Sequence, residues 1–469
     1  MRADLRRERG SKRHWRFARI DWKEALKHLA FAVCAGVVCG LASVVLCIVV
    51  GWAFDIFRAL PWLIWLLPVM GIIQLLVYKR WKIPQDLTTH RVVIYLREDK
   101  PISALLAPGI LFGTATTIVS GGSVGKEAAA LQMGASLGTL VSRPFKVKSV
   151  YAVDDSESMS GYVAALGMAA QFSALFFAPL GSALFVMELS RFKRSINKHI
   201  GSIVVACFVA FLVSSTIGIG DYVDRIDPVD ITWLVVAQCI VIGVATALMG
   251  SVFDSAIKWI HDITWRITKN FYVWVVAGGL IFATLVTLFG WQAYAGSGGS
   301  TLNDALSGHF DMTGFAIKAL LTLICLGFWF KGGEITPSFC IGGLLGATCS
   351  SLIGGDIVFG VAVGVITFFA AFSRCPLAAF VMGCEILGWY MAPYIAIGVF
   401  VAYNFSSPVG MYGDGVDRAL RVKWHDVISG VTQRRIDGLE KADSSAIASA
   451  QEMIDDVKKE IVEDTSKPS

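Results

Sequence analysis

Charged residues are scarce in this chain. Asp, Glu, Lys and Arg together make up 16% of its 469 residues, whereas roughly 25% is usual in soluble proteins. Hydrophobic residues make up 55%, and the mean hydropathy is +0.63. A soluble fold of this size has too few polar groups to cover so much apolar surface. The composition therefore argues against a soluble enzyme, a nucleic-acid-binding protein and a disordered scaffold, and it predicts a polytopic membrane protein.

The chain also lacks the patterns of a disulfide framework or a metal site. All ten cysteines lie inside apolar runs, with no CxxC pair and no histidine at metal-ligand spacing. We interpret them as small, buried apolar residues. The sequence therefore implies no cofactor and no metal.

Positive charge is concentrated at the N-terminus. Residues 1–28 hold ten Lys or Arg against four acids, directly before the first apolar run. A nucleic-acid-binding arm is the alternative, but such a segment is typical of the positive-inside bias. It is too long and too charged for the n-region of a cleaved signal peptide. We therefore expect a retained cytoplasmic segment at 1–28, and a second hydrophilic cytoplasmic tail at 414–469.

Apolar runs long enough for transmembrane helices fill the chain between these segments. A helix needs ~20 apolar residues to cross the hydrocarbon core of a bilayer. Runs near that length lie at 29–57, 60–78, 101–119, 160–188, 199–219, 231–253, 272–290, 313–330 and 376–403. Two further segments, 127–142 and 336–353, are short, rich in small residues, and begin beside charged residues. Short helices at membrane depth are tolerated only where protein or a water-filled cavity surrounds them.

A proline–leucine pattern occurs twice. Pro179-Leu180 is followed by Glu188, nine residues after the proline, and Pro376-Leu377 is followed by Glu385 at the same interval. Gly and Pro are common in transmembrane helices, which is the simpler explanation of either segment alone.

The two short segments repeat each other as well. Gly125-Lys126-Glu127 precedes Gly134 and Gly138 in the first, and Gly332-Gly333-Glu334 precedes Gly342 and Gly346 in the second. Repeats with interrupted helices at corresponding positions place a binding site at the repeat interface, near the midplane. We therefore predict an all-α fold of two inverted halves, 29–219 and 220–413, whose short broken helices meet at the membrane midplane.

The first glycine-rich segment ends in Gly125-Lys126-Glu127, where a turn opens a short helix. The first N–H groups of a helix have no internal partner, and the macrodipole adds positive charge there. Glycine lets a small anion approach these groups closely. Glu127 carries an anionic group to the same place, so we predict that it competes with the anion and leaves when protonated. A helix N-terminal glutamate with no transport role is the alternative.

The second segment is Gly333-Glu334-Ile335-Thr336-Pro337. Pro337 suits the first turn of a helix, and Thr336 can cap that helix or present its hydroxyl to an ion. Glu334 is a second intramembrane acid, related to the first by the repeat. A structural ion pair with Lys331 is the alternative.

Tyr412 follows the last apolar run, in a third segment with Pro408 and Gly410. Its hydroxyl can donate a hydrogen bond to an anion. Taken alone, Tyr412 is better explained by a belt of interfacial tyrosines.

Taken together, these segments resemble the CLC family of chloride channels and anion/proton antiporters over roughly residues 30–415. GSVGKEAA resembles the family's GK/REGP segment, and GGEITP resembles its GxFxP segment. The resemblance implies that Glu127 is the gating glutamate and that Tyr412 is the tyrosine of the central anion site. It also implies a homodimer.

Three departures concern the ion. Residues 83–89 lack both glycines of the GSGIP segment that carries an ion-coordinating serine in chloride-type members. Glu334 and Thr336 resemble the fluoride-exporting branch, which exchanges fluoride for protons. The inner glutamate of proton-coupled chloride antiporters corresponds to Leu189, so either the chain is a channel or protons take another route, for which Glu334 is a candidate relay.

Two other classes compete with this interpretation. Gly218-Ile219-Gly220-Asp221 spells the GxGD pattern of intramembrane aspartyl proteases, which need a second aspartate on a neighbouring helix. A transporter of organic solutes needs a larger cavity than glycine-opened helix ends provide.

We therefore expect a multi-pass protein of the cell membrane, with both termini cytoplasmic and no enzymatic reaction. We expect it to export fluoride in exchange for protons, with chloride transport or a chloride channel as the alternative. Glu127 and Glu334 would carry gating and proton transfer. The predicted anion-binding residues are Gly125, Lys126, Gly333, Ile335, Thr336 and Tyr412.

Overall fold

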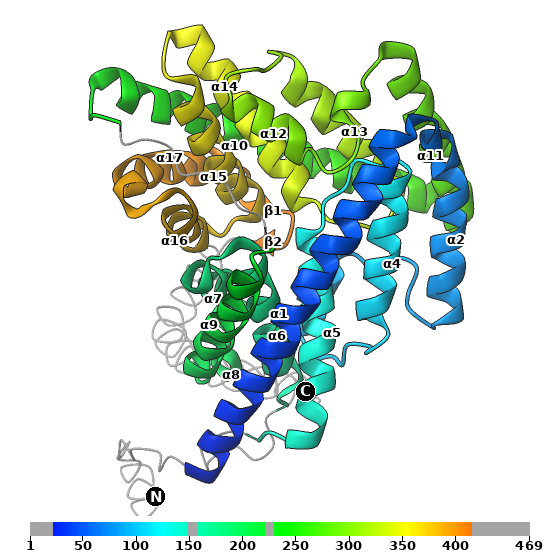
Figure 1. Ribbon diagram of the computed structural model, residues 1–469, viewed down its shortest axis with the longest axis vertical. Helices are drawn as coiled ribbons and strands as arrows, with labels where there is room; N and C mark the ends of the chain where they lie inside the picture. Colours follow the sequence, from blue (N-terminus) through cyan, green and yellow to red (C-terminus); the bar gives the residue numbers. More distant parts are fainter. Residues whose placement is uncertain (1–21, 149–157, 221–228, 415–469) are drawn as a thin grey trace, which may run out of the picture. The chain divides into compact units, whose positions relative to one another are not determined.

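The computed structural model describes residues 22–148, 158–220 and 229–414, and these residues are mainly helical (Figure 1). In the first half the helices are α1 (Trp22–Ala59), η3 (Pro61–Leu66), α2 (Leu67–Arg80), α3 (Thr89–Arg97), α4 (Leu106–Val119), α5 (Glu127–Phe145), α6 (Ser160–Phe176), α7 (Pro179–Leu189), α8 (Arg194–Asn197) and α9 (Ile200–Ile217). The predicted all-α polytopic fold is confirmed.

The second half has the same kind of elements. They are α10 (Trp233–Ile267), α11 (Phe271–Phe289), η4 (Gln292–Tyr294), α12 (Gly299–Leu306), α13 (Gly314–Gly327), α14 (Ile335–Ile353), α15 (Ile357–Ser373), α16 (Pro376–Leu387), η5 (Trp389–Met391) and α17 (Ala392–Phe405). Two short strands, β1 (Val409–Gly410) and β2 (Gly413–Asp414), pair with each other after α17. By its contacts the chain divides into two units, Met1–Gly413 and Asp414–Ser469.

Six helical stretches of the described chain are long and apolar enough to cross a membrane. They are Trp22–Ala59, Pro61–Arg80, Ile200–Ile217, Trp233–Ile267, Phe271–Phe289 and Ile335–Ile353. Three predicted runs each contain more than one helix, because a proline opens a new helix inside the run. The run at 60–78 contains η3 and α2, the run at 160–188 divides into α6 and α7, and the run at 376–403 divides into α16, η5 and α17.

Of the apolar helices in the described chain, the predicted runs omit one. α15 spans 17 residues, and nearly all of them are buried. It packs against both α14 and α17 in the second half. The sequence interpretation therefore overlooked a central helix, which follows a short polar turn.

Close helix pairs explain the repeated glycines. A Cβ added to Gly134 would lie 2.4 Å from the carbonyl oxygen of Gly167, so α5 and α6 approach each other through backbone. In the second half a Cβ on Gly346 would lie 2.0 Å from the carbonyl oxygen of Gly360, and α14 approaches α15 in the same way. The predicted inverted repeat is confirmed. From the point where their N-termini meet, α5 runs downward and α14 runs upward (Figure 1).

The proline–leucine repeats are also a structural pair. Glu188, at the end of α7, accepts hydrogen bonds from the amides of Leu377 (3.2 Å) and Ala378 (2.7 Å) at the start of α16. Carboxylates are favourable at helix N-termini, where the macrodipole is positive.

The second half makes the corresponding contact with the first half. Glu385 of α16 accepts hydrogen bonds from the amides of Leu180 (3.0 Å) and Gly181 (2.7 Å) at the start of α7. Each half therefore caps a helix of the other.

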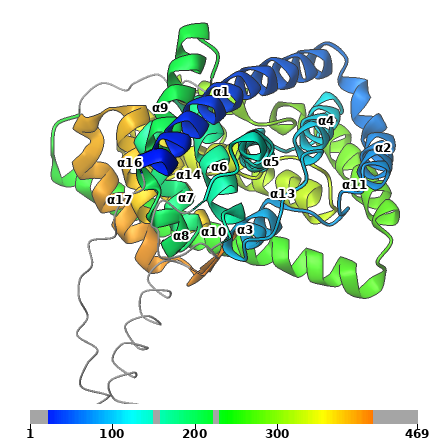
Figure 2. The same cartoon turned by 90° about the horizontal axis from the view of Figure 1, so that it is seen from below.

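The two broken helices lie inside the membrane unit. Seen from below, α5 and α14 are in the middle of the helices, with α1 and α10 on opposite sides and α2 and α17 further out (Figure 2). In the apolar stretch of α14, 83% of the residues are buried in protein, which agrees with the rule that helices interrupted at membrane depth are enclosed.

Candidate functional site

The N-termini of α5 and α14 meet at two glycines. The amide of Gly125 donates to the carbonyl oxygen of Gly333 at 2.7 Å, and the amide of Gly333 donates to the carbonyl oxygen of Gly125, also at 2.7 Å. Gly125 lies two residues before the start of α5 at Glu127, and Gly333 lies two residues before the start of α14 at Ile335. The structure thus brings together the two segments that the sequence predicts as one site.

Gly125 has no room for a side chain. An added Cβ would lie 2.3 Å from the Thr336 hydroxyl oxygen and 2.5 Å from Glu127 Oε2. Real Cβ atoms do not approach other atoms so closely, so the glycine lets these two side chains converge on the backbone.

Glu127 reaches across to the other half. Its side chain is fully buried, and Oε2 accepts a hydrogen bond of 3.0 Å from the amide of Thr336, in the first turn of α14. Unpaired amides at a helix N-terminus bind anions, and here the carboxylate of Glu127 acts as that anion. The predicted gating residue therefore faces its partner half.

Glu334 accepts hydrogen bonds from two hydroxyl groups. The Tyr412 hydroxyl donates to Oε1 at 2.7 Å, and the Thr89 hydroxyl donates to Oε2 at 3.3 Å. The Gln132 amide nitrogen donates in turn to the Thr89 oxygen at 3.0 Å. Glu334 is 3% exposed, so these neutral donors supply the hydrogen bonds that water would otherwise make.

Tyr412 is held by backbone and aromatic contacts. The amide of the preceding Met411 donates to the carbonyl oxygen of Phe372 at 3.0 Å. The rings of Phe185 and Phe372 meet the Tyr412 ring edge-on, with centroids 6.1 and 6.2 Å away. The hydroxyl is therefore fixed beside Glu334 rather than lying in an interfacial belt.

The ion pair considered between Lys331 and Glu334 is not among the ion pairs of the described residues. The Lys331 ammonium instead donates to the carbonyl oxygen of Gln85 and lies over the Tyr78 ring, 5.0 Å from its centroid. The Lys331 carbonyl oxygen accepts from the Thr117 hydroxyl at 2.7 Å. Lys331 therefore joins the segment before α14 to the first half.

The other predicted residues surround the same point. Ile335 is the first residue of α14 and is fully buried, and Thr336 follows it. Lys126 is half-buried at the N-cap position of α5. In the described chain, the side chains of the N-cap residues Lys126 and Glu334 make no capping hydrogen bond to their helices. The Thr336 amide, in the first turn of α14, instead donates to Glu127.

Sequence reasoning missed Thr89 and Gln132. Residues 83–89 were interpreted only as a departure from a glycine-rich segment, but they still end in hydroxyl residues at the start of α3. Thr88 caps that helix by accepting from the Arg91 amide at 3.4 Å. A hydroxyl residue at a helix start was the available signal, and it went unused because the glycines were absent.

Lys318 was missed as well. This residue of α13 is fully buried and donates to the carbonyl oxygens of Tyr294 at 3.0 Å and Gly296 at 2.7 Å. The amide of Gly296 donates to the carbonyl oxygen of Gly121 at 2.8 Å. Lys318 therefore supports the turn that leads into the first broken helix.

The aspartyl protease alternative gains no support from the described residues. Asp221 lies outside them. Two long apolar helices contain aspartates: Asp55 lies near the end of α1, and α10 continues past the predicted run to Ile267 and includes Asp254. Asp254 in that helix is buried and ion-paired with Lys258 at 2.6 Å, which gives it a structural role.

Comparison with known families and structures agrees with the geometry of the two broken helices. The family described as voltage gated chloride channel matches residues 70–407. The chain belongs to this family, the CLC family. As a CLC protein it is a multi-pass membrane protein. Its relatives include the chloride/fluoride channel protein of Pseudomonas syringae pv. tomato, which is 29% identical over 82% of this chain and 85% of the relative.

A second relative is the H(+)/Cl(-) exchange transporter ClcA of Cronobacter sakazakii. It is 26% identical over 69% of this chain and 73% of the relative. Among solved structures, a CLC-type fluoride/proton antiporter matches with a TM-score of 0.75 and 24% identity, covering 82% of this chain and 96% of that one. A slow cyanobacterial Cl-/H+ antiporter matches with a TM-score of 0.70 and 19% identity, covering 84% and 97%. These structures share the CLC fold.

Proposed function

We propose that this CLC protein exports fluoride in exchange for protons. The observation that carries the proposal is the pair of buried carboxylates at the meeting point of the two halves. Glu127 accepts from the amide of Thr336, and Glu334 accepts from the hydroxyls of Tyr412 and Thr89. Both sets of donors would suit a small anion equally well.

The exchange follows from competition between carboxylate and anion. A carboxyl group that gains a proton loses most of its attraction for hydrogen-bond donors, so a protonated Glu127 vacates the first turn of α14. The anion then occupies the donors that the carboxylate has left. When the anion leaves, Glu127 returns to these donors and releases its proton. Movement of the anion in one direction is therefore coupled to movement of a proton in the other.

Fluoride is favoured by the nature of the donors. A small anion with strongly held water needs several strong hydrogen bonds to replace its hydration. The amides of Gly125 and Gly333 are taken up by their mutual pairing. The first-turn amides of α5 and α14 and the hydroxyls of Thr336 and Tyr412 can provide these hydrogen bonds, and the Lys126 charge lies at the start of α5. A relative at 29% identity is named a chloride/fluoride channel protein, and one fold neighbour is a fluoride/proton antiporter.

A chloride channel or chloride/proton exchanger is the second candidate. It is favoured by the match to an H(+)/Cl(-) exchange transporter. Leu189 stands where the resemblance places an inner glutamate, and this favours a channel unless Glu334 carries the protons.

Reconstituted vesicles test these candidates directly. Purified protein is placed in liposomes loaded with potassium fluoride or potassium chloride, and anion efflux is followed together with internal pH. We expect fluoride efflux that drives protons inward and continues against a modest pH gradient. Chloride efflux at an equal or higher rate would contradict the fluoride assignment. Fluoride efflux without proton movement would contradict exchange.

We further propose that the protein is a homodimer in the cell membrane with both termini cytoplasmic. The ten basic residues within 1–28 support the orientation, and the family resemblance supports the dimer. Light scattering on the detergent-solubilised protein measures its mass. Labelling of single introduced cysteines at either end from outside intact cells measures orientation, and reaction there would contradict it.

A further inference from the structure

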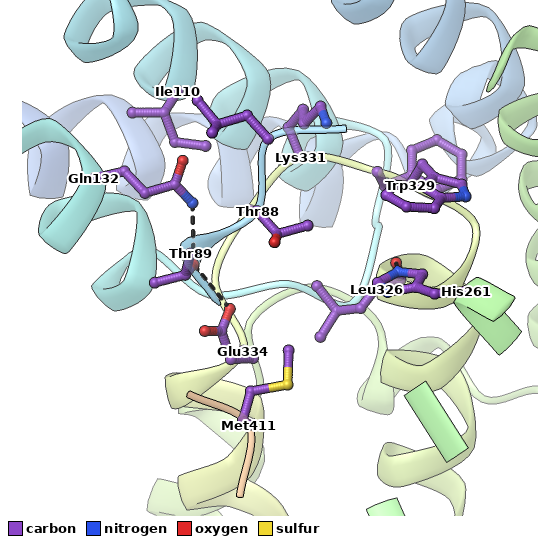
Figure 3. Close-up of a pocket in the computed structure, with 13 residues that line it drawn as sticks. Thr88, Thr89, Ile110, Gln132, His261, Leu326, Trp329, Lys331, Glu334 and Met411 are labelled. Atoms are coloured by element: carbon purple, nitrogen blue, oxygen red, sulfur yellow. Dashed lines mark hydrogen bonds between the residues drawn. The ribbon is translucent and has the colours of Figure 1, made fainter. Parts of the chain in front are cut away.

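Two neighbouring cavities lie on one side of Glu334. The inner cavity, drawn in Figure 3, has a volume of about 30 Å³ and is lined by Glu334, Thr89 and Gln132 among others. This is room for a water molecule, which needs roughly 10–15 Å³. The outer cavity has a volume of about 230 Å³, and its walls include the exposed residues Arg91 and Asp262. A single layer of side chains therefore separates water in the outer cavity from the inner cavity.

Three residues line both cavities: Thr88, His261 and Trp329. His261 stacks on the indole of Trp329, with ring centroids 4.2 Å apart and planes 20° from parallel. Figure 3 shows this pair on the side of the pocket opposite Gln132. The stacked rings form the wall between the outer cavity and the space beside Glu334.

The hydrogen bond of His261 fixes which ring nitrogen can exchange a proton. Nε2 lies 3.0 Å from the carbonyl oxygen of Leu326. A carbonyl oxygen only accepts, so Nε2 carries the hydrogen and donates it. Nδ1 is therefore the nitrogen of the neutral ring that accepts a proton.

Charged and titratable groups face this ring from several elements. Asp262 neighbours it on α10, and Lys331 acts on it from the segment before α14. From the first half, Asp86 and Arg91 form an ion pair in the wall of the outer cavity.

His90 of α3 lines the outer cavity as well. Burial, together with the nearby positive charges of Arg97 and Lys258, lowers the pKa of His90 to about 4. His90 lines the outer cavity but not the inner one, so it does not connect the outer cavity with Glu334.

We propose that His261 is the proton-transfer residue that connects the outer cavity with Glu334. Its Nδ1 takes a proton from water in the outer cavity and, after the ring turns, gives the same proton to water in the inner cavity. The Glu334 carboxylate accepts a proton from that water; the turn of the ring breaks the hydrogen bond to Leu326 for a time, and no other covalent bond forms or breaks. The inference rests on the proposed exchange function and supplies its proton route, which in this chain replaces the inner glutamate absent at Leu189.

The test measures proton and fluoride flux in vesicles of the full-length protein. Wild type decides the proposed function, because absent proton movement contradicts exchange whatever the route. If wild type exchanges, His261→Phe keeps an aromatic ring against Trp329 but has no basic nitrogen. We expect its proton flux to fall by about tenfold or more, since positioned acid–base groups contribute roughly 10²–10⁴-fold. His309→Phe is the matched control, because His309 is exposed and lines neither cavity, and it should transport as wild type.

Two further variants separate proton transfer from packing. His261→Gln can still donate to the Leu326 carbonyl oxygen but cannot carry a proton, so it should be as slow as His261→Phe. In His261→Ala the outer cavity can admit a small ring, and added imidazole should restore proton flux, whereas pyrrole, which has the same shape but no basic nitrogen, should not. Wild-type proton flux in His261→Gln, or equal rescue by pyrrole and imidazole, would overturn the proposal.

Discussion

Gly125 and Gly333 are paired through their backbones by two hydrogen bonds of 2.7 Å. One glycine comes from each half, and each lies two residues before its broken helix. The pairing fixes the two helix N-termini at one point; Glu127 comes two residues after Gly125, and Glu334 comes directly after Gly333. The positions of the two acids are therefore set by backbone geometry.

Replacing Glu127 by glutamine should stop or uncouple the exchange. The Glu127→Gln side chain would keep its size but could not release a proton, so competition with the anion would no longer depend on pH. We expect proton movement to be lost while fluoride movement either stops or becomes passive, as measured by simultaneous fluoride and pH recording in vesicles. Glu98→Gln is the control, because Glu98 forms an exposed ion pair with Lys100. The gate assignment fails if Glu127→Gln retains wild-type coupled flux.

Glu334→Gln should impair coupling if Glu334 relays protons. The number of fluoride ions moved per proton, obtained from reversal potentials, is the relevant measurement. An unchanged ratio would leave Glu334 with only a structural role.

Removing the Tyr412 hydroxyl tests the donors around Glu334. Hydrogen bonds to charged groups contribute about 1.5–3 kcal/mol, so Tyr412→Phe should weaken the apparent affinity for fluoride by roughly tenfold or more. The control is Tyr394→Phe, which removes a hydroxyl that donates to the carbonyl oxygen of Val229 instead. Equal fluoride affinity in both variants would remove Tyr412 from the anion site.

The reciprocal helix caps should contribute measurably to stability. Glu188→Ala leaves the amides of Leu377 and Ala378 without their acceptor, which costs about 1–3 kcal/mol. We expect a lower thermal unfolding midpoint in detergent for Glu188→Ala, and a smaller decrease for Glu188→Gln, whose amide oxygen still accepts. Glu385→Ala should be milder than Glu188→Ala, because Glu385 is only partly buried. Unfolding of Glu188→Ala at the wild-type midpoint would contradict this account.

Lys318 should matter to both stability and transport. Lys318→Met fills a similar volume but removes the donor to the carbonyl oxygens of Tyr294 and Gly296, and a buried acceptor without a partner costs roughly 1–3 kcal/mol. We expect a lower unfolding midpoint and slower fluoride efflux, with partial recovery in Lys318→Arg. Lys100→Met, at an exposed position, serves as the comparison. A Lys318→Met protein as stable and active as Lys100→Met would refute the assigned role.

Some features of the site can be recognised from the sequence, and others cannot. Gly125 and Gly333 were found because close approach to a helix N-terminus requires glycine, and the repeat displays the requirement twice. The contact between Thr89 and Glu334 joins residues 245 positions apart. A single hydroxyl residue in the sequence does not indicate which distant residue it will contact. Lys318 was equally hidden, because its acceptors are backbone carbonyl oxygens that any sequence provides.

The fold was predictable for a related reason. Prolines and glycines that start helices or let them pack closely recur at fixed intervals, so the two halves could be aligned by inspection. α15 was overlooked although it is strongly apolar, since no span was predicted between the segments at 336–353 and 376–403. Periodic constraints on backbone are visible in one sequence, whereas long-range side-chain pairs are not.

The exchanged carboxylate caps also limit how the chain could be shortened. Glu188 serves a helix of the second half, and Glu385 serves a helix of the first. A half-length polypeptide would therefore contain a capping glutamate without the helix that it caps, and a helix N-terminus without its capping glutamate. Such a fragment could complete both contacts only by meeting a second copy inserted upside down, so a bilayer would have to accept the same chain in two opposite orientations.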